Sequence, residues 1–295
     1  MGDVSCARRT FVKAVPAIGA AVTATTVWGH PLHAVADEGT KGKIVEPEMN
    51  ELEFDFVCDG VKTKKVEVER DGLVLRGTLE VPACVPETSV PMVLLLHGAR
   101  GNRRSDLYDN VCRSLAARGY AMMRFDFDGH GDSDGEFDDS TVLTELADMD
   151  AIVAYAQSFP WVERLFVFGH SQGGCVASMY AGQNPDVFDG IVTVDAAVNI
   201  RDNCESGSLD GKASAAYVEA GKTLEIFETA ANYDGPALVI HGLADTVVLP
   251  EYSERLHESL ENSSLYLIAG AAHTPASHLD EIVCLTDLFY RRCMR

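Results

Sequence analysis

Ser171 lies in a short glycine-rich sequence whose residue types suit a nucleophile. The motif Gly169-His170-Ser171-Gln172-Gly173 follows the apolar run 165–168 and precedes a stretch with helical periodicity. A sharp turn from strand to helix exposes the serine hydroxyl at the edge of a sheet, and the glycines leave room for a strained backbone. Because G-x-S-x-G also arises by chance, the interpretation depends on the predicted strand and helix around it. The alternative is a glycine-rich turn whose serine caps the helix.

A serine hydroxyl needs two partners to become nucleophilic at neutral pH. An imidazole accepts its proton, and a carboxylate fixes the tautomer of that imidazole. Asp245 and His273 follow Ser171 in that chain order, each just after a predicted strand. We therefore expect Ser171, His273 and Asp245 to form a catalytic triad. The weaker candidates do not follow strands directly: His278 for the base, and Asp280 and Glu251 for the acid.

Two backbone N–H groups are expected to stabilise the oxyanion of a tetrahedral intermediate. Gln172 supplies one, as the first residue of the helix after the serine. Ala99 supplies the other, from the open loop 97–101 that follows the apolar run 92–96. The residues predicted to contact substrate lie in or near these motifs and in the second half of the chain: His97, Arg100, His170, Tyr217, Leu224, Phe227 and Val247.

The run 126–135 is rich in aspartate and glycine, like a calcium-binding loop. Its register does not fit, because no glycine at the sixth position coincides with a glutamate at the twelfth. A tight loop held by Asx turns beside the nucleophile is the favoured interpretation, with calcium as the weaker alternative. We expect no metal and no cofactor.

The elements that would position these residues alternate along the chain. The first part of the fold is predicted to be a set of antiparallel strands at 51–58, 63–69 and 73–81. Short runs that are apolar on both faces then predict buried parallel strands at 92–96, 121–127, 165–168, 191–194, 237–240 and 265–268. Helical periodicity lies between them at 104–118, 143–158, 172–182, 252–261 and 278–292. This predicts an α/β fold with a mostly parallel central sheet and helices on both faces. Segment 196–235 predicts a short cap over the carboxyl edge of the sheet, with ordinary crossover packing as an equal alternative.

Composition excludes several classes of protein. The chain has 295 residues, 46% of them hydrophobic, which is enough for the large core of a domain predicted at 51–295. Its net charge of −21 argues against a nucleic-acid partner. Its cysteines show no zinc-type spacing, and seven of the eight remain without Cys6, an odd number that cannot all pair. Most are expected to be small buried hydrophobic residues.

The first 36 residues predict an export signal. Arg8-Arg9-Thr10-Phe11-Val12-Lys13 resembles a twin-arginine signal, and Ala34-Val35-Ala36 suits signal peptidase. Glycine and proline dilute the apolar run, so cleavage is favoured over a retained membrane anchor. We expect the twin-arginine machinery as a partner, a linker at 37–50, no stable membrane insertion after cleavage, and an exported protein outside the cell, in its envelope or in the periplasm. The sequence gives no indication of oligomeric state.

Together, the motifs resemble the α/β-hydrolases of the cinnamoyl and feruloyl esterase group. The resemblance runs through 97–103, 126–137, 169–174, 226–228, 241–248 and 270–273, and covers most of 60–290. It implies hydrolysis of a small-molecule carboxylic ester through an acyl-enzyme, with hydroxycinnamate esters as the leading substrates. Ala99 stands where members of the family usually have a bulky aromatic residue. Residues 200–212 contain no evident counterpart of the segment of the family's cap that contacts the phenolic hydroxyl. The alternatives are a serine peptidase or thioesterase on the same fold, and a non-catalytic binding protein.

Overall fold

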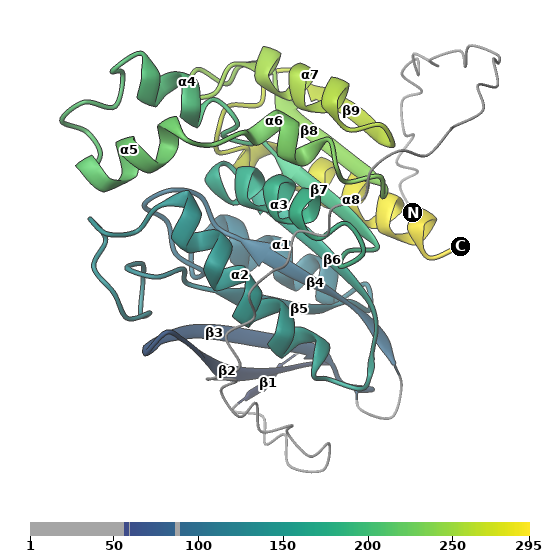
Figure 1. The fold of residues 1–295 in the computed structure, drawn as a ribbon. Helices are drawn as coiled ribbons and strands as arrows, with labels where there is room; N and C mark the ends of the chain where they lie inside the picture. The colour runs from purple at the N-terminus through teal and green to yellow at the C-terminus, as the bar shows by residue number, and fades with distance from the viewer. Residues whose placement is uncertain (1–55, 59, 86–88) are drawn as a thin grey trace, which may run out of the picture. The chain divides into compact units, whose positions relative to one another are not determined.

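The computed structural model of the protein describes residues 56–58, 60–85 and 89–295. The predicted signal (1–36) and linker (37–50) lie outside these residues, as does most of the predicted strand segment 51–58. The described chain is built on a nine-stranded sheet with the order β1-β2-β3-β5-β4-β6-β7-β8-β9 (Figure 1). The strands are β1 (Phe56–Cys58), β2 (Val61–Arg70), β3 (Leu73–Pro82), β4 (Val90–Leu96), β5 (Ala121–Phe125), β6 (Val162–His170), β7 (Gly190–Val194), β8 (Ala237–Gly242) and β9 (Ser263–Ile268).

The sheet has an antiparallel edge and a parallel remainder. β1, β2 and β3 pair antiparallel, and β3 joins the rest through an antiparallel pairing with β5. From β5 through β4 to β9 every neighbouring pair is parallel. The carboxyl ends of parallel strands meet at one edge of a sheet, which is where ligands bind in open α/β folds. The residues that follow β4, β6, β8 and β9 are therefore brought together.

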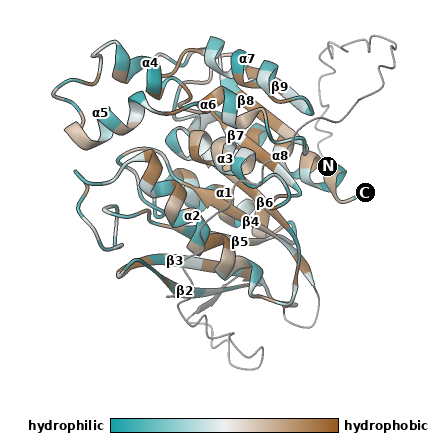
Figure 2. Cartoon of the chain, viewed as in Figure 1, coloured by the Kyte–Doolittle hydropathy of each residue, from teal (hydrophilic) through white to brown (hydrophobic). Residues whose placement is uncertain are grey.

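Helices cover both faces of the sheet. They are α1 (Asp106–Ala116), α2 (Val142–Gln157), α3 (Gln172–Gln183), α4 (Ile200–Glu205), α5 (Ala215–Lys222), α6 (Ile226–Ala230), α7 (Pro250–Ser259), the 3-10 helix η2 (Ala276–His278) and α8 (Leu279–Cys293). Met92 and Leu94 of β4 pack into the core beneath α2, α3, α6 and α7, whereas Val93 between them packs beneath α1 and α8. Both faces of the strand are buried, and hydrophobic residues fill the middle of the fold (Figure 2). The predicted α/β fold is confirmed.

Local sequence sets where the helices begin. The Ser105 hydroxyl accepts a hydrogen bond from the Tyr108 N–H and caps α1. Thr141 and Thr144 exchange side-chain and backbone hydrogen bonds at the start of α2. β5 ends at Phe125, two residues before the predicted end of its apolar run, because Asp126 begins the aspartate-rich loop.

Segment 196–235, named here the cap segment, lies between β7 and β8 and contains α4, α5 and α6. α6 packs on α3, where Gly182 leaves room for the backbone of Thr229. α4 and α5 project beyond the carboxyl edge of the sheet, at the upper left of Figure 1. In the part of the chain that the structure describes, no helix combines the length and apolar character needed to cross a bilayer.

Candidate active site

Ser171 lies in a strained turn between β6 and α3. Its φ of 54° falls in the left-handed region, which costs a non-glycine residue about 1–3 kcal/mol and is common at functional sites. A Cβ at Gly169 would overlap the backbone of Gly173, and one at Gly173 would overlap the carbonyl of Leu96. The glycines are therefore required by close packing of the turn, which holds the serine at the end of β6.

The structure brings Ser171, His273 and Asp245 together from three loops. His273 Nε2 lies 2.9 Å from Ser171 Oγ, and His273 Nδ1 lies 2.7 Å from Asp245 Oδ2. Burial favours a raised pKa for Asp245, but hydrogen bonds with His241, His273 and Val247 outweigh it and hold the pKa below its usual range. The ionised carboxylate accepts a hydrogen bond from Nδ1–H, so the Nε2 lone pair faces the hydroxyl. This arrangement can activate the serine as a nucleophile.

A buried hydrogen-bond chain connects the loop after β4 to the loop that carries His273. The Gly98 N–H donates to the Tyr108 hydroxyl (2.8 Å), which lies 3.0 Å from His170 Nδ1. His170 Nε2 lies 2.8 Å from the carbonyl oxygen of His273. Burial lowers the pKa of His170 to about 4, so its ring is neutral and donates from Nε2. His170 thus supports the backbone of His273 and does not face the pocket.

Behind the triad lies a buried cluster formed by Asp195, His241 and Asp245. The three offer ligand atoms close enough together to hold a metal ion. His241 Nε2, however, lies 2.9 Å from the Val248 carbonyl and 3.3 Å from Asp245 Oδ2, two acceptors that require a proton on this nitrogen. Its Nδ1 is 2.7 Å from the Ser253 hydroxyl. A protonated Nε2 has no lone pair for a metal, so the cluster fits an electrostatic role beside Asp245.

The surroundings of His241 favour its protonated form. Burial lowers the pKa of His241, but the hydrogen bond with Asp245 and the charge of Asp195 outweigh burial and place the pKa above its usual value. His241 and His273 therefore both donate to the triad carboxylate, whose other oxygen accepts the N–H groups of Val247 and Val248. These donors keep Asp245 ionised.

The aspartate-rich loop after β5 is held by arginines. Arg103 pairs with Asp126 and with Asp132 at 2.8 Å, and Arg76 pairs with Asp134 at 2.6 Å. The Asp132 N–H also donates to Asp126 Oδ2 at 2.8 Å. The carboxylates of this loop thus have cationic partners from the protein itself, which supports the interpretation of a tight structural loop over a calcium site.

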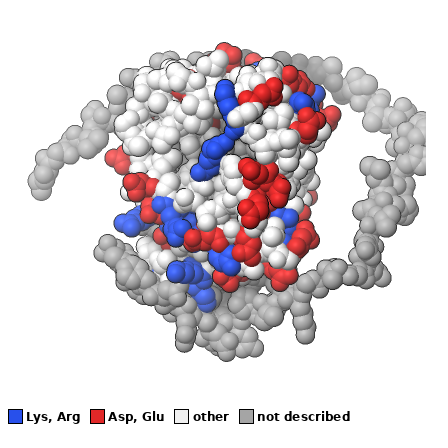
Figure 3. All heavy atoms as spheres, turned by 90° about the vertical axis from the view of Figure 1, so that its left-hand side faces the viewer, with Lys and Arg blue, Asp and Glu red and all other residues white. Residues whose placement is uncertain are grey.

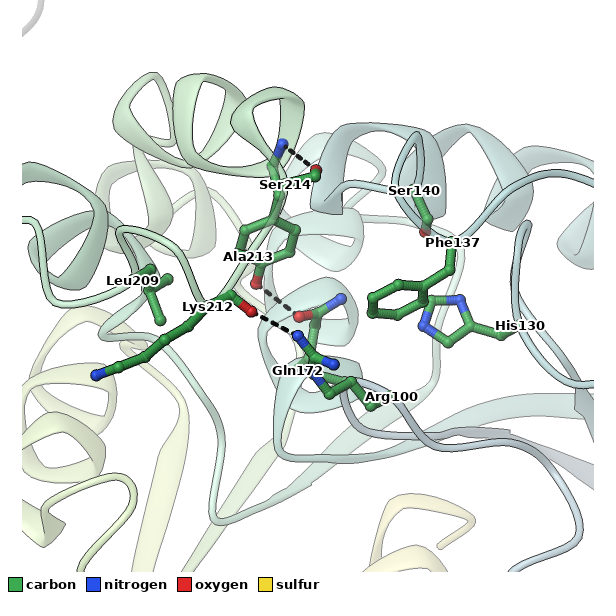
Figure 4. Close-up of a pocket in the computed structure, with 11 residues that line it drawn as sticks. Arg100, His130, Phe137, Ser140, Gln172, Leu209, Lys212, Ala213 and Ser214 are labelled. Atoms are coloured by element: carbon green, nitrogen blue, oxygen red, sulfur yellow. Dashed lines mark hydrogen bonds between the residues drawn. The ribbon is translucent and has the colours of Figure 1, made fainter.

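A pocket of about 200 Å³ lies beside the two candidate oxyanion donors. Gln172 begins α3, so its N–H has no acceptor within the helix. Ala99 follows Gly98, whose backbone lies against Ser171. The pocket is lined by these two residues, by the loop after β5 and by the cap segment: Ala99, Arg100, His130, Phe137, Ser140, Gln172, Leu209, Lys212, Ala213, Ser214 and Tyr217 (Figure 4).

The other residues predicted to contact substrate lie elsewhere. His97 is buried, its Nδ1 lies 2.9 Å from the Gly98 carbonyl, and its Nε2 accepts the Phe127 N–H. Burial lowers the pKa of His97 to about 4. Leu224 is buried in the core, Phe227 packs under the Arg255 guanidinium, and Val247 is exposed after Asp245. The structure therefore brings Arg100 and Tyr217 to the pocket, but not His97, His170, Leu224, Phe227 or Val247.

Several lining residues were missed by sequence reasoning. His130 and Phe137 belong to a loop that the sequence singled out only for its shape, and Leu209 and Ala213 lie in the cap segment without any periodic pattern. Arg100 has a left-handed φ of 56°, donates to the Lys212 carbonyl at 2.5 Å and lies over the Phe137 ring. It thus joins three separate segments at the mouth of the pocket.

The charge around the pocket differs from that of the chain as a whole. Its lining includes Arg100 and Lys212 but no carboxylate. Figure 3 shows the side of the molecule on which α4 and α5 lie, where basic side chains cross a largely uncharged area and acidic ones lie around it. The net charge of −21 therefore does not describe what a substrate meets at this site.

The chain is similar in sequence to several known proteins. The family model for serine aminopeptidase, S33, matches residues 88–223. The quorum-quenching protein AidA of Acinetobacter baumannii is 34% identical over 91 residues, 30% of each chain. The sn-1-specific diacylglycerol lipase ABHD11 of Mus musculus is 25% identical over 199 residues, 67% of this chain and 60% of the lipase. The chain thus covers less than two thirds of the length of these curated relatives.

A solved structure is similar over a larger part of the fold. Est1E from Butyrivibrio proteoclasticus, determined with ferulic acid bound, has a TM-score of 0.73 and 26% identity. The match covers 78% of this chain and 99% of Est1E. The esterase Pf2001 of Pyrococcus furiosus, at 22% identity and a TM-score of 0.64, shares the fold. A serine, a histidine and an aspartate converge at the carboxyl edge of the sheet, and the structural similarity shows that the chain has the α/β-hydrolase fold.

Proposed function

We propose that this protein is a serine hydrolase of small-molecule carboxylic esters that forms an acyl-enzyme on Ser171. One observation carries the proposal: His273 Nε2 lies 2.9 Å from a serine hydroxyl held in a strained turn, while Nδ1 is bound to an ionised Asp245. A serine that merely capped a helix would not need this arrangement. A binding protein that had kept only the fold would not need it either.

In this proposal each step is carried out by a residue of the site. Ser171 Oγ attacks the ester carbonyl as His273 takes its proton, and the oxyanion faces the N–H groups of Ala99 and Gln172. His273 then gives the proton to the leaving alcohol, and the same residues add water to the acyl-enzyme. Because His273 must protonate the alcohol, the alcohol leaves on the histidine side. The acyl group therefore occupies the pocket beside Ala99 and Gln172.

The pocket suits an acyl group of moderate size. An apolar cavity of about 150 Å³ holds benzene, so the cavity of about 200 Å³ admits one ring with a few further atoms. The rings of Phe137 and Tyr217 line it, which favours an aromatic acyl group. Hydroxycinnamate esters meet both criteria, and the similarity to Est1E with ferulic acid bound supports the same class.

Burst kinetics test the mechanism. Wild type and Ser171→Ala are mixed with p-nitrophenyl acetate, and a fluorophosphonate is used to label the serine. We expect a burst of p-nitrophenol and one labelled site in wild type, and neither in the variant. Equal turnover by the two proteins would contradict the proposal.

A substrate panel tests the acyl preference. It compares methyl ferulate, chlorogenate, p-nitrophenyl butyrate and p-nitrophenyl palmitate with an aminoacyl anilide and a thioester. We expect higher kcat/KM for the ferulate esters than for the palmitate, whose chain exceeds the pocket. The anilide and the thioester represent the peptidase and thioesterase alternatives, the first of which corresponds to the matched family model. A preference for either would redefine the leaving group and leave the triad in place.

We also propose that the chain is exported through the twin-arginine route. The motif at Arg8 and Arg9 and the Ala34-Val35-Ala36 site support this. Arg8→Lys combined with Arg9→Lys is expected to abolish export in a bacterial host that has the machinery, as measured by fractionation. The exported wild type should begin at Asp37. Unchanged export of the double variant would contradict the route, and an exported protein that retained residues 1–36 would contradict cleavage.

A further inference from the structure

Glu145 is a buried acid that the mechanism above does not use. It lies in the first turn of α2 with 1% of its surface exposed, beneath the pocket and outside its lining. Among the described residues no cation pairs with it, and its Oε2 has no hydrogen-bond partner. Burial raises the pKa of Glu145 well above its usual range, and the nearby Asp128 and Asp148 act in the same direction. Burial without a cationic partner in the described part of the chain thus favours the protonated, neutral carboxyl group.

Glu145 binds the side chain of the residue that follows the nucleophile. Gln172 Nε2 donates to Glu145 Oε1 at 2.7 Å, and Gln172 Oε1 accepts from the Tyr217 hydroxyl at 2.6 Å. The Gln172 amide, central in Figure 4, is thus hydrogen-bonded both to α2 and to α5 of the cap segment. The backbone N–H of the same residue is the candidate oxyanion donor. One residue therefore joins the oxyanion site to the cap segment.

The position of Tyr217 is fixed from its own element as well. Its N–H donates to the hydroxyl of Ser214, which caps α5, and its ring lines the acyl pocket. Two hydrogen bonds thus place this ring: one at the start of α5 and one through Gln172. Loss of the Glu145 acceptor would free the amide to rotate, and the hydroxyl of Tyr217 would lose a fixed partner.

We infer that Glu145 is a positioning residue for ester hydrolysis: through the Gln172 side chain it sets both the oxyanion donor after Ser171 and the Tyr217 wall of the acyl pocket. The inference rests on the proposed function. It requires an acceptor oxygen at position 145, where Gln172 Nε2 donates. Glutamine retains that oxygen and leucine removes it, so the pair of substitutions separates this role from simple filling of the core.

The experiment measures kcat and KM for methyl ferulate, with rates expressed per serine titrated by a fluorophosphonate so that misfolded protein is not counted. We expect Glu145→Leu to lower kcat/KM about 5- to 10-fold, the effect of losing one ordinary hydrogen bond. Glu145→Gln retains the acceptor oxygen, so its kcat/KM should stay within about twofold of wild type. The matched control is Glu163→Leu, an exposed glutamate at the opposite end of β6, which should behave as wild type.

A double-mutant cycle shows whether the three residues act as one chain. Tyr217→Phe removes the hydroxyl at the other end of this hydrogen-bond chain. Its position is partly exposed, so the variant can be measured even if Glu145→Leu folds poorly. We expect the combination of Glu145→Leu and Tyr217→Phe to cost no more than the larger single effect. Wild-type kinetics in Glu145→Leu, equal losses in the leucine and glutamine variants, or fully additive effects would overturn the inference. Absence of hydrolysis by wild type would instead overturn the proposed function.

Discussion

Asp195 offers a sharp test of the electrostatics behind the triad. It follows β7 with a left-handed φ of 50° and no exposed surface. Its Oδ1 accepts the Gly242 N–H at 2.8 Å, while Oδ2 has no partner among the described residues. Asp195→Asn keeps the side-chain shape and the Oδ1 acceptor, places an amide NH2 at the position of Oδ2, and removes the ability to ionise. The substitution therefore isolates what ionisation of this carboxyl costs the fold.

The size of the effect follows from the pKa of Asp195. Burial raises it from 3.8 to about 6, against the opposing hydrogen bond from Gly242 and the charge of His241. A difference of about two in pKa corresponds to about 3 kcal/mol. Because the folded state binds this proton more tightly than the unfolded chain does, the stabilisation is present below about pH 4 and is lost as pH rises through 6. Asparagine has no such proton to lose.

Urea unfolding of wild type and Asp195→Asn between pH 4 and pH 8 measures this directly. The free energy of unfolding of the variant, relative to wild type, should rise by about 2–3 kcal/mol across that range. Asp186→Asn, which neutralises an exposed aspartate, is the control and should give a nearly constant difference. A constant difference for Asp195→Asn, or one that falls with pH, would refute the reasoning.

Two further substitutions and one labelling reaction test other parts of the structure. Gly173→Ala forces the new methyl group against the Leu96 carbonyl, so turnover of p-nitrophenyl acetate should fall about 100-fold as the serine is displaced. An active Gly173→Ala protein would contradict the packing of the turn. Tyr233→Phe removes a hydroxyl bonded to the Phe188 carbonyl, and should lower the urea unfolding free energy by about 1 kcal/mol. Under native conditions iodoacetamide should modify the exposed Cys84 and Cys284 before the buried Cys175, whose pKa burial raises; mass spectrometry of the peptides would show the order, and early labelling of Cys175 would count against it.

The sequence predicted the elements of the fold in which buried residues recur with a regular pattern along the chain. β4 and β6 are apolar on both faces because helices cover both sides of the sheet, and this produces the continuous runs from which the parallel strands were recognised. The turn at Ser171 was predicted because its glycines are needed where backbone segments touch. Asp245 and His273 were found because each directly follows a strand that ends at the same edge.

The rest of the site depends on side-chain direction and on long-range contacts. His97 directly follows β4 and was expected to face substrate, yet its ring points into the core and binds the backbone of Phe127. Neighbouring strand residues point to opposite faces, so closeness in sequence to a functional loop does not decide where a side chain lies. Tyr108 and Glu145 belong to helices whose patterns indicate only burial. Their roles depend on single hydrogen bonds to Gly98 and Gln172, which no local pattern encodes.

The cap segment has two parts that differ in packing: α6, which packs against α3, and the connection between α4 and α5. At Gly182 the helix that begins after the nucleophile touches the backbone of Thr229, so no side chain fits between α3 and α6 there. The connection between α4 and α5, by contrast, is mostly exposed and supplies Leu209, Lys212 and Ala213 to the pocket. Under the proposed function, exchange of residues 206–213 should alter which acyl groups fit the pocket and leave the triad in place.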